Sequence, residues 1–233
     1  MTDIKVIGFD ADDTLWICEP IFRNAEAKVC ELLTPWMERE ALLNRILEIH
    51  VRNMPLYGYG IKGYILSLTE TALEISDGKV SQEVLTRILE LGKEMLQEPV
   101  VLINDVESVL PKLKERYKLI VVTKGDLLDQ QRKLEASGLL PLFDGVEILS
   151  DKKPDDYRKM FSRQNIAPSE FMMIGNSLKS DILPVMELGS KGVYIPYEIT
   201  WAHERVEEMD KDNPLFHEIS HMDEIYHLLG ESR

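Results

Sequence analysis

Short apolar runs alternate with helical hydrophobic repeats along most of this chain. Runs typical of buried strands occur at 4–9, 119–123, 145–149, 171–175 and 192–196. Apolar residues with helical spacing lie at about 106–116, 127–137, 155–165 and 178–188. Strands that alternate with helices are typical of a parallel sheet covered by helices on both faces. The pattern therefore predicts an α/β fold with a doubly wound parallel sheet.

The long interval after the first predicted strand departs from this alternation. Residues 18–97 contain no convincing strand pattern and at least four amphipathic helical repeats. An interval of about eighty residues is much longer than an ordinary connection between two strands. We therefore expect an all-α cap domain at 18–97, inserted into a core formed by 1–17 and 98–233, with the chain returning near Pro99.

Composition narrows the classes of partner. The chain has 233 residues, of which 44% are hydrophobic, so it can bury a full core. No apolar run approaches the length of a membrane span and no signal-peptide pattern is visible, so we expect a cytoplasmic protein without a membrane partner. The net charge of −14 argues against a nucleic-acid partner. An anionic substrate would therefore need a local positive site.

Acidic residues follow the first predicted strand directly. Asp10, Asp12 and Asp13 lie where open α/β sheets hold their active sites, and a carboxylate cluster without His or Cys suits Mg²⁺. An Asp of such a cluster can also act as a nucleophile. The same residue types are common in turns and helix caps. An EF-hand loop is excluded, because Leu15 replaces the required Gly and Ile21 replaces the bidentate Glu.

Polar residues also follow the next three predicted strands. They include Thr123 and Lys124, then Lys152 and Lys153, and finally Asn176 and Asp181. A hydroxyl and backbone N–H groups at a strand end can hold phosphate, although Thr123 is equally suited to cap a helix. Four successive strand ends with acids, a hydroxyl, lysine and again an acid are rarely a coincidence. The combination predicts a phosphate-directed active site.

On these motifs the chain resembles the haloacid dehalogenase (HAD) superfamily over essentially its whole length. The motifs are DxDxT at Asp10, Asp12 and Thr14, then Thr123, a lysine before Pro154, and the segment from Gly175 to Asp181. The resemblance implies that Asp10 is a nucleophile that forms an aspartyl-phosphate, and that Asp12 is a general acid and then a base. It also implies that Thr123 and the third-motif lysine hold the phosphoryl oxygens.

The resemblance implies a Mg²⁺ site between the carboxylates of Asp10 and Asp181 and the backbone carbonyl of Asp12. Asn176 stands where the family often has Asp, and its carbonyl can still accept a metal ion directly or through water. The third motif is ambiguous, because Lys152 and Lys153 both precede the proline. The spacing to Tyr157 resembles that of family members with a lysine one residue further from the proline, and it favours Lys152.

The resemblance also bears on the reaction, because dehalogenases of the superfamily lack the second Asp of the DxDxT motif. The presence of Asp12 therefore favours phosphoryl transfer over dehalogenation. We expect a Mg²⁺-dependent phosphomonoesterase that acts on a small phosphorylated metabolite. A phosphomutase, a phosphoacceptor module similar to receiver domains, and a phospho-ligand binding protein without turnover stay as alternatives. Further candidates for substrate binding are Lys124, Lys153, and the tyrosines Tyr57 and Tyr59 between two cap helices. The tyrosines are nearly as well suited to packing at a tight helix–helix turn.

Overall fold

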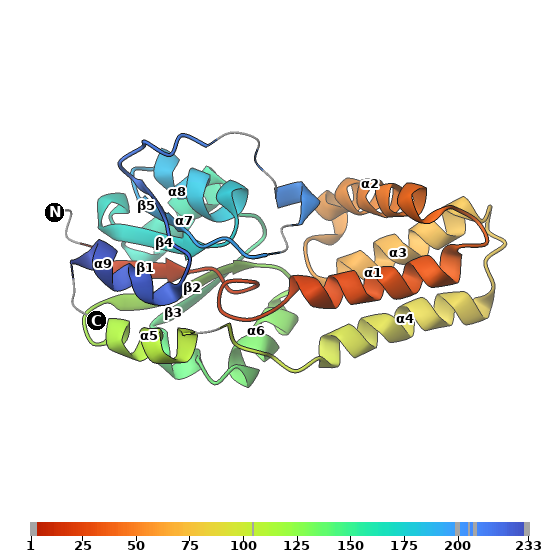
Figure 1. Cartoon of the computed structure of the whole chain (residues 1–233), viewed down its shortest axis with the longest axis horizontal. Coiled ribbons are helices and arrows are strands. Elements are labelled where there is room, and N and C mark those ends of the chain that lie inside the picture. Colours follow the sequence, from red (N-terminus) through yellow and green to blue (C-terminus); the bar gives the residue numbers. More distant parts are fainter. Residues whose placement is uncertain (1–3, 104, 199–200, 205, 207–208, 231–233) are drawn as a thin grey trace. The chain divides into compact units, whose positions relative to one another are not determined.

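The computed structural model describes residues 4–103, 105–198, 201–204, 206 and 209–230. These residues form two compact units, a sheet unit and a helical unit, which are treated separately (Figure 1). The sheet unit comprises described residues within Met1–Glu19, Val100–Lys124 and Gln130–Arg233. The helical unit comprises Pro20–Pro99 and Gly125–Asp129. In the described part of the chain, no helix has the length and apolar character needed to cross a membrane.

The sheet confirms the predicted α/β fold. Within the described residues it has six parallel strands in the order β3-β2-β1-β4-β5-β6. The strands are β1 (Val6–Phe9), β2 (Lys118–Lys124), β3 (Gly145–Leu149), β4 (Phe171–Gly175), β5 (Lys191–Tyr194) and β6 (Phe216–Glu218). The strand order reverses between β1 and β4, and open α/β sheets bind ligands beside the carboxyl ends of strands at such a point.

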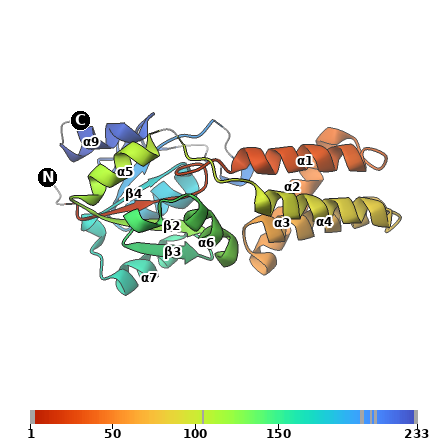
Figure 2. The same cartoon turned by 90° about the horizontal axis from the view of Figure 1, so that it is seen from below.

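Helices cover both faces of the sheet (Figures 1 and 2). The helices are α5 (Val106–Lys114), α6 (Leu127–Ala136), α7 (Pro154–Gln164), α8 (Leu183–Glu187) and α9 (Ile225–Leu229). Side chains alternate along β1, so Ile7 and Phe9 pack with residues of α5 and α9, whereas Val6 packs with residues of α7 and α8. An apolar core therefore lies on each face of the sheet and supports β1 from both sides.

The helical unit contains α1 (Glu19–Leu33), α2 (Arg39–Tyr57), α3 (Ile61–Ile75) and α4 (Gln82–Gln97). Its core consists of the apolar faces expected from the helical repeats, with Val29, Leu42, Leu68 and Ile88 fully buried. Ser81 caps the start of α4, and its hydroxyl accepts a hydrogen bond from the backbone N–H of Val84. Whether residues 18–97 behave as an independent cap domain stays a prediction.

Gly8 lies in β1 at a position where no side chain fits. A Cβ there would lie 2.4 Å from Cζ and 2.9 Å from Cε2 of Phe171. The strand cannot yield, because it is paired with β2 on one side and β4 on the other. We expect Gly8→Ala to lower the free energy of unfolding by about 1–3 kcal/mol, as measured by urea denaturation.

Phe171→Leu provides the matched test of this collision, because it removes the aromatic carbons that the new methyl group would meet. The double variant should be more stable than the sum of the two single losses predicts, by about 0.5 kcal/mol or more. Strictly additive losses would show that Gly8 is required for another reason.

Candidate active site

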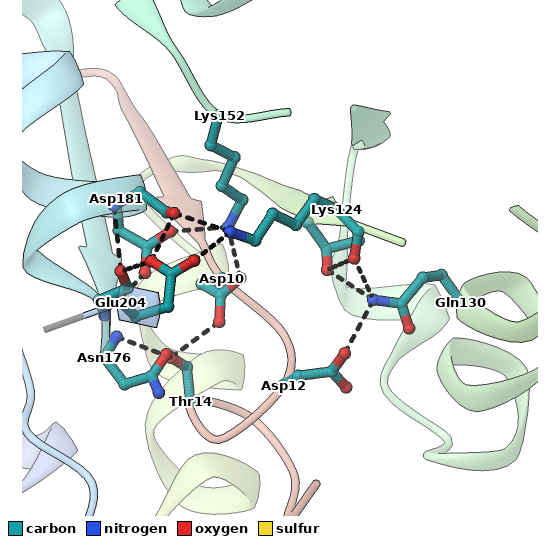
Figure 3. Close-up of polar contacts among 12 residues, drawn as sticks. Asp10, Asp12, Thr14, Lys124, Gln130, Lys152, Asn176, Asp181 and Glu204 are labelled. Carbon is teal, nitrogen blue, oxygen red and sulfur yellow. Dashed lines mark hydrogen bonds and ion pairs between the residues drawn. The ribbon is translucent and has the colours of Figure 1, made fainter. Parts of the chain in front are cut away.

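A buried lysine lies between two carboxylates at the carboxyl edge of the sheet (Figure 3). Asp10 directly follows β1, Lys152 follows β3, and Asp181 follows β4. The Lys152 ammonium donates hydrogen bonds to Oδ1 of Asp10 and, at 2.6 Å, to Oδ1 of Asp181. All three residues are buried, with exposed fractions of 6%, 3% and 1% in chain order. Two buried carboxylates therefore share one ammonium group.

Burial and the neighbouring charges shift the pKa values of Asp181 and Lys152. Burial is the main cause that raises the pKa of Asp181 to about 7; the charge of Asp10 adds to it and Lys152 opposes it. Burial acts to lower the pKa of Lys152, but the two carboxylates outweigh it and hold this pKa above its ordinary value. The raised pKa of Lys152 thus reflects two carboxylates that act on one ammonium, whereas the raised pKa of Asp181 reflects mainly its burial.

The turn after β4 places Asp181 against the strand. The Ser177 hydroxyl accepts a hydrogen bond from the backbone N–H of Ser180 at 3.0 Å and so caps a short π-helical segment, Leu178–Ile182. Oδ2 of Asp181 accepts a hydrogen bond from the backbone N–H of Ser177 at 3.0 Å. A Cβ at position 175 would lie 2.3 Å from this same oxygen, so Gly175 is required for the approach.

Thr14 connects the first motif to the fourth. Its hydroxyl oxygen accepts a hydrogen bond from the backbone N–H of Asn176 at 3.1 Å. Its proton can reach either Oδ2 of Asp10 at 3.2 Å or Oδ1 of Asn176 at 3.3 Å. The side-chain carbonyl of Asn176 is therefore close to the Asp10 carboxylate through one shared hydroxyl.

Asp12 has different direct partners from Asp10, although it lies only two residues away (Figure 3). Oδ1 of Asp12 accepts hydrogen bonds from Lys133 at 2.6 Å and from the indole N–H of Trp16 at 2.7 Å. Oδ2 of Asp12 accepts a hydrogen bond from Nε2 of Gln130 at 3.0 Å. Burial acts to raise the pKa of Asp12, but Lys133 and the other donors outweigh it and hold this pKa below its ordinary value.

Gln130 and Lys133 were not found from the sequence. They lie three residues apart on α6, and this spacing on a predicted helix after the second motif is the signal that indicates one shared face. Nε2 of Gln130 also lies 2.7 Å from the hydroxyl of Thr123. Asp12 is thereby connected to the strand end that was predicted to hold phosphate.

Lys124 is paired with an acid that the sequence did not reveal. Its ammonium lies 2.5 Å from Glu204 and donates a hydrogen bond to the Ser180 hydroxyl at 2.8 Å. The Glu204 carboxylate also accepts hydrogen bonds from the hydroxyls of Ser177 and Ser180. Burial raises the pKa of Glu204, but Lys124 and these hydroxyls outweigh it and bring the pKa to about 2. The positive charge of Lys124 is therefore balanced within the protein.

The remaining candidates lie elsewhere. Lys153 is exposed and forms an ion pair with Asp151 at 2.8 Å. Tyr57, which is 48% exposed, ends α2, and Tyr59 lies in the loop before α3; both belong to the helical unit. The sheet unit holds the other candidates at its carboxyl edge: Asp10, Asp12, Thr123, Lys124, Lys152, Asn176 and Asp181.

The donor set suits a hard cation. Among the residues that the structure describes, no three His, Cys, Asp or Glu side chains converge as a metal cluster, and the Asp12 carboxylate is directed toward Lys133. Asp10 and Asp181 nevertheless offer carboxylate oxygens in a buried site with excess negative charge. Such oxygens are ligands that Mg²⁺ prefers in proteins. Asp12 would then contribute its backbone carbonyl only.

A family model described as haloacid dehalogenase-like hydrolase matches residues 4–185. The chain belongs to this family. The HAD-like hydrolase is similar to a solved haloacid dehalogenase-like family hydrolase from Xanthomonas campestris, with 34% identity and a TM-score of 0.87. That similarity covers 98% of this chain and 91% of the other. The predicted family and the prediction of a hydrolytic enzyme are confirmed.

Two curated relatives of the HAD-like hydrolase carry phosphatase names. An N-acylneuraminate-9-phosphatase of Mus musculus is 22% identical over 202 residues, which cover 82% of each chain. A glyceraldehyde 3-phosphate phosphatase of Pyrococcus furiosus is 27% identical over 210 residues, covering 84% of this chain and 82% of the relative.

The contacts of Lys152 with Asp10 and Asp181 predict how its loss changes the stability of the protein, measured in the presence of EDTA. Lys152→Met leaves two buried carboxylates facing each other without a counter-charge, which should cost about 3–5 kcal/mol. For a chain of this size the midpoint of thermal unfolding should fall by about 6–20 °C, as measured by circular dichroism. A midpoint within about 2 °C of the wild type would show that the carboxylates are not held together by this lysine.

Asp10→Asn is the matched variant, and it should be at least as stable as the wild type. An amide oxygen can still accept from Lys152, its NH₂ group can donate to Thr14, and the Thr14 proton can turn to Asn176. Removing one of two carboxylates also relieves the charge imbalance. A large loss of stability in this variant would contradict the proposed rearrangement of hydrogen bonds.

Proposed function

We propose that this HAD-like hydrolase is a Mg²⁺-dependent phosphomonoesterase that uses Asp10 as its nucleophile. Its substrate would be a small phosphorylated metabolite in the cytoplasm, with no nucleic-acid or membrane partner. The observation that carries the proposal is the Asp10 carboxylate, which ends the central strand and is oriented by Lys152 and Thr14. The phosphatase names of the two curated relatives support the choice of phosphate esters.

In the first step, an oxygen of Asp10 attacks phosphorus, and a new P–O bond forms as the ester P–O bond breaks. The bonding electrons pass to the ester oxygen, which takes a proton from the carboxyl group of Asp12 and leaves as an alcohol. Lys152, and Thr123 through its hydroxyl, are proposed to hold the phosphoryl oxygens, because charge spreads over these oxygens in the transition state.

In the second step, water attacks the phosphorus of the aspartyl-phosphate. The Asp12 carboxylate removes the proton of the water, the P–O bond to Asp10 breaks, and inorganic phosphate leaves. Asp12 thus returns to its starting protonation state, and Asp10 is regenerated as a carboxylate. The two steps balance without an external acid, base or oxidant.

Asp10, Asp181, the Asp12 backbone carbonyl and Asn176 are the residues that would hold Mg²⁺. When bound, Mg²⁺ would neutralise charge on the phosphoryl oxygens and on the two carboxylates. Charge supports a cation here: the chain carries a net charge of −14, and one ammonium, that of Lys152, faces two buried carboxylates.

Asp10→Asn should abolish hydrolysis of p-nitrophenyl phosphate in the presence of Mg²⁺. Because an amide is not a nucleophile of comparable strength, we expect kcat to fall at least about a thousandfold. The stability measurement above serves as the folding control. Residual turnover above about a tenth of the wild-type kcat would mean that another group attacks phosphorus. Wild-type protein that binds phosphate esters without sustained release would instead support the non-catalytic alternative.

Tyr57 and Tyr59 stay candidates for substrate selection in the helical unit. Substituting either tyrosine with Ala should change kcat/KM unevenly across a panel of phosphate esters, because a selecting side chain contacts the variable leaving group. Thr123→Ala should lower kcat/KM for all esters by a similar factor, because every substrate shares the phosphoryl group. A common factor for the tyrosine variants as well would show that this segment only packs the turn between α2 and α3.

A further inference from the structure

Lys133 is a largely but not fully buried cation that contacts the proposed proton-transfer group and has no role in the steps above. Its side chain is 11% exposed, and its ammonium lies 2.6 Å from Oδ1 of Asp12. We infer that Lys133 is a positioning residue, which fixes the Asp12 carboxyl group for proton transfer to the leaving-group oxygen. The inference rests on the proposed function, because it assigns Lys133 a part in the first step of that reaction.

Two other side chains, those of Trp16 and Gln130, also donate hydrogen bonds to Asp12. The indole N–H of Trp16 donates to the same oxygen at 2.7 Å, and Gln130 donates to the other oxygen at 3.0 Å. Trp16 lies on the same loop as Asp12, whereas Lys133 and Gln130 come from α6. The carboxyl group is therefore held from two sides, and Lys133 is the charged member of the three donors.

Gln130 connects Asp12 to the end of β2. Its Nε2 lies 3.0 Å from Asp12 and 2.7 Å from the hydroxyl of Thr123, at the end of β2. Asp12 is thus placed relative to the strand end that is proposed to hold the phosphoryl group. A carboxyl group that drifted from this position would miss the ester oxygen, and proton transfer is sensitive to displacements of this size.

Two substrates with different leaving groups can distinguish a loss of Asp12 positioning from partial unfolding of the protein. An alkyl phosphate releases a strongly basic alkoxide, which needs a proton as the P–O bond breaks. p-Nitrophenyl phosphate releases a stabilised phenolate, which leaves without one. Loss of Asp12 positioning should therefore slow the alkyl ester selectively, whereas partial unfolding should slow both substrates by the same factor.

The kinetic test compares Lys133→Met with Lys133→Arg, using ethyl phosphate and p-nitrophenyl phosphate with Mg²⁺. We expect Lys133→Met to lose about 10–100-fold in kcat/KM on the alkyl ester and less than about threefold on the aryl ester. Lys133→Arg should recover most of the loss. The control is Lys159→Met, a matched loss of one lysine on the exposed surface of α7, which should change neither substrate.

Two kinetic outcomes would overturn the inference. Equal losses on both esters would mean that Lys133 only stabilises the fold. Faster hydrolysis of the alkyl ester by Lys133→Met would mean that the contact holds Asp12 away from the reaction. Wild-type protein that hydrolyses neither ester would refute the proposed function itself, and the contact would then be judged by the measurement below.

The second readout does not depend on turnover. The chain has three tryptophans, so ¹H–¹⁵N spectra contain three indole signals. The signal that is missing in a Trp16→Phe variant belongs to Trp16. Because the Trp16 indole N–H donates to Asp12, its signal reports the position of that carboxyl group. We expect Lys133→Met to shift the Trp16 signal and Lys159→Met to leave it in place. An unshifted Trp16 signal in Lys133→Met would show that Lys133 does not position Asp12.

Discussion

The active-site edge depends on one ammonium group that holds two buried carboxylates together. The strands β1 and β4 are neighbours, and the backbone N–H of Asp10 donates to the carbonyl of Ile174 at 2.9 Å, so Asp10 and the turn that bears Asp181 are forced close. Lys152 follows β3, which is separated from β1 by β2. A long side chain is needed to span that distance, and lysine supplies both the length and the charge.

This arrangement lowers the free energy of unfolding relative to a core of apolar residues in the same place. Removing carboxylates from water is unfavourable, and one ammonium compensates only part of the penalty for two. Sites of this kind persist where the surrounding fold is well packed, and here apolar clusters lie on both faces of the sheet. Under the proposed function, the residual negative charge opposes an anionic substrate until a cation is bound, and the binding of Mg²⁺ and of phosphate esters should then be coupled.

Sequence patterns located the strands and the polar residues at their ends because buried strands are continuous apolar runs. They missed β6, since only Phe216 of its three residues is buried and the run is too short to recognise. The patterns favoured Lys152 over Lys153, and in the structure Lys152 is buried and Lys153 is exposed. Successive side chains of an extended segment point in opposite directions, so only one of the two lysines can face inward. Which one does so depends on the path of the backbone, and the sequence does not give that path. Contacts such as Glu204 with Lys124 join distant segments, and no periodicity reveals them.

The two acids of the first motif are separated electrostatically although they are neighbours in sequence. Asp10 is paired with Lys152, whereas Asp12 is paired with Lys133. If both carboxylates shared one lysine, any change in the protonation of one would disturb the other. Each carboxylate thus has a lysine of its own, and the proposed two-step hydrolysis gives them different tasks, attack on phosphorus to Asp10 and proton transfer to Asp12. Lys133, on α6 and outside the four motifs, is therefore in direct contact with a residue of the first motif, and this contact is the basis for the positioning role inferred above.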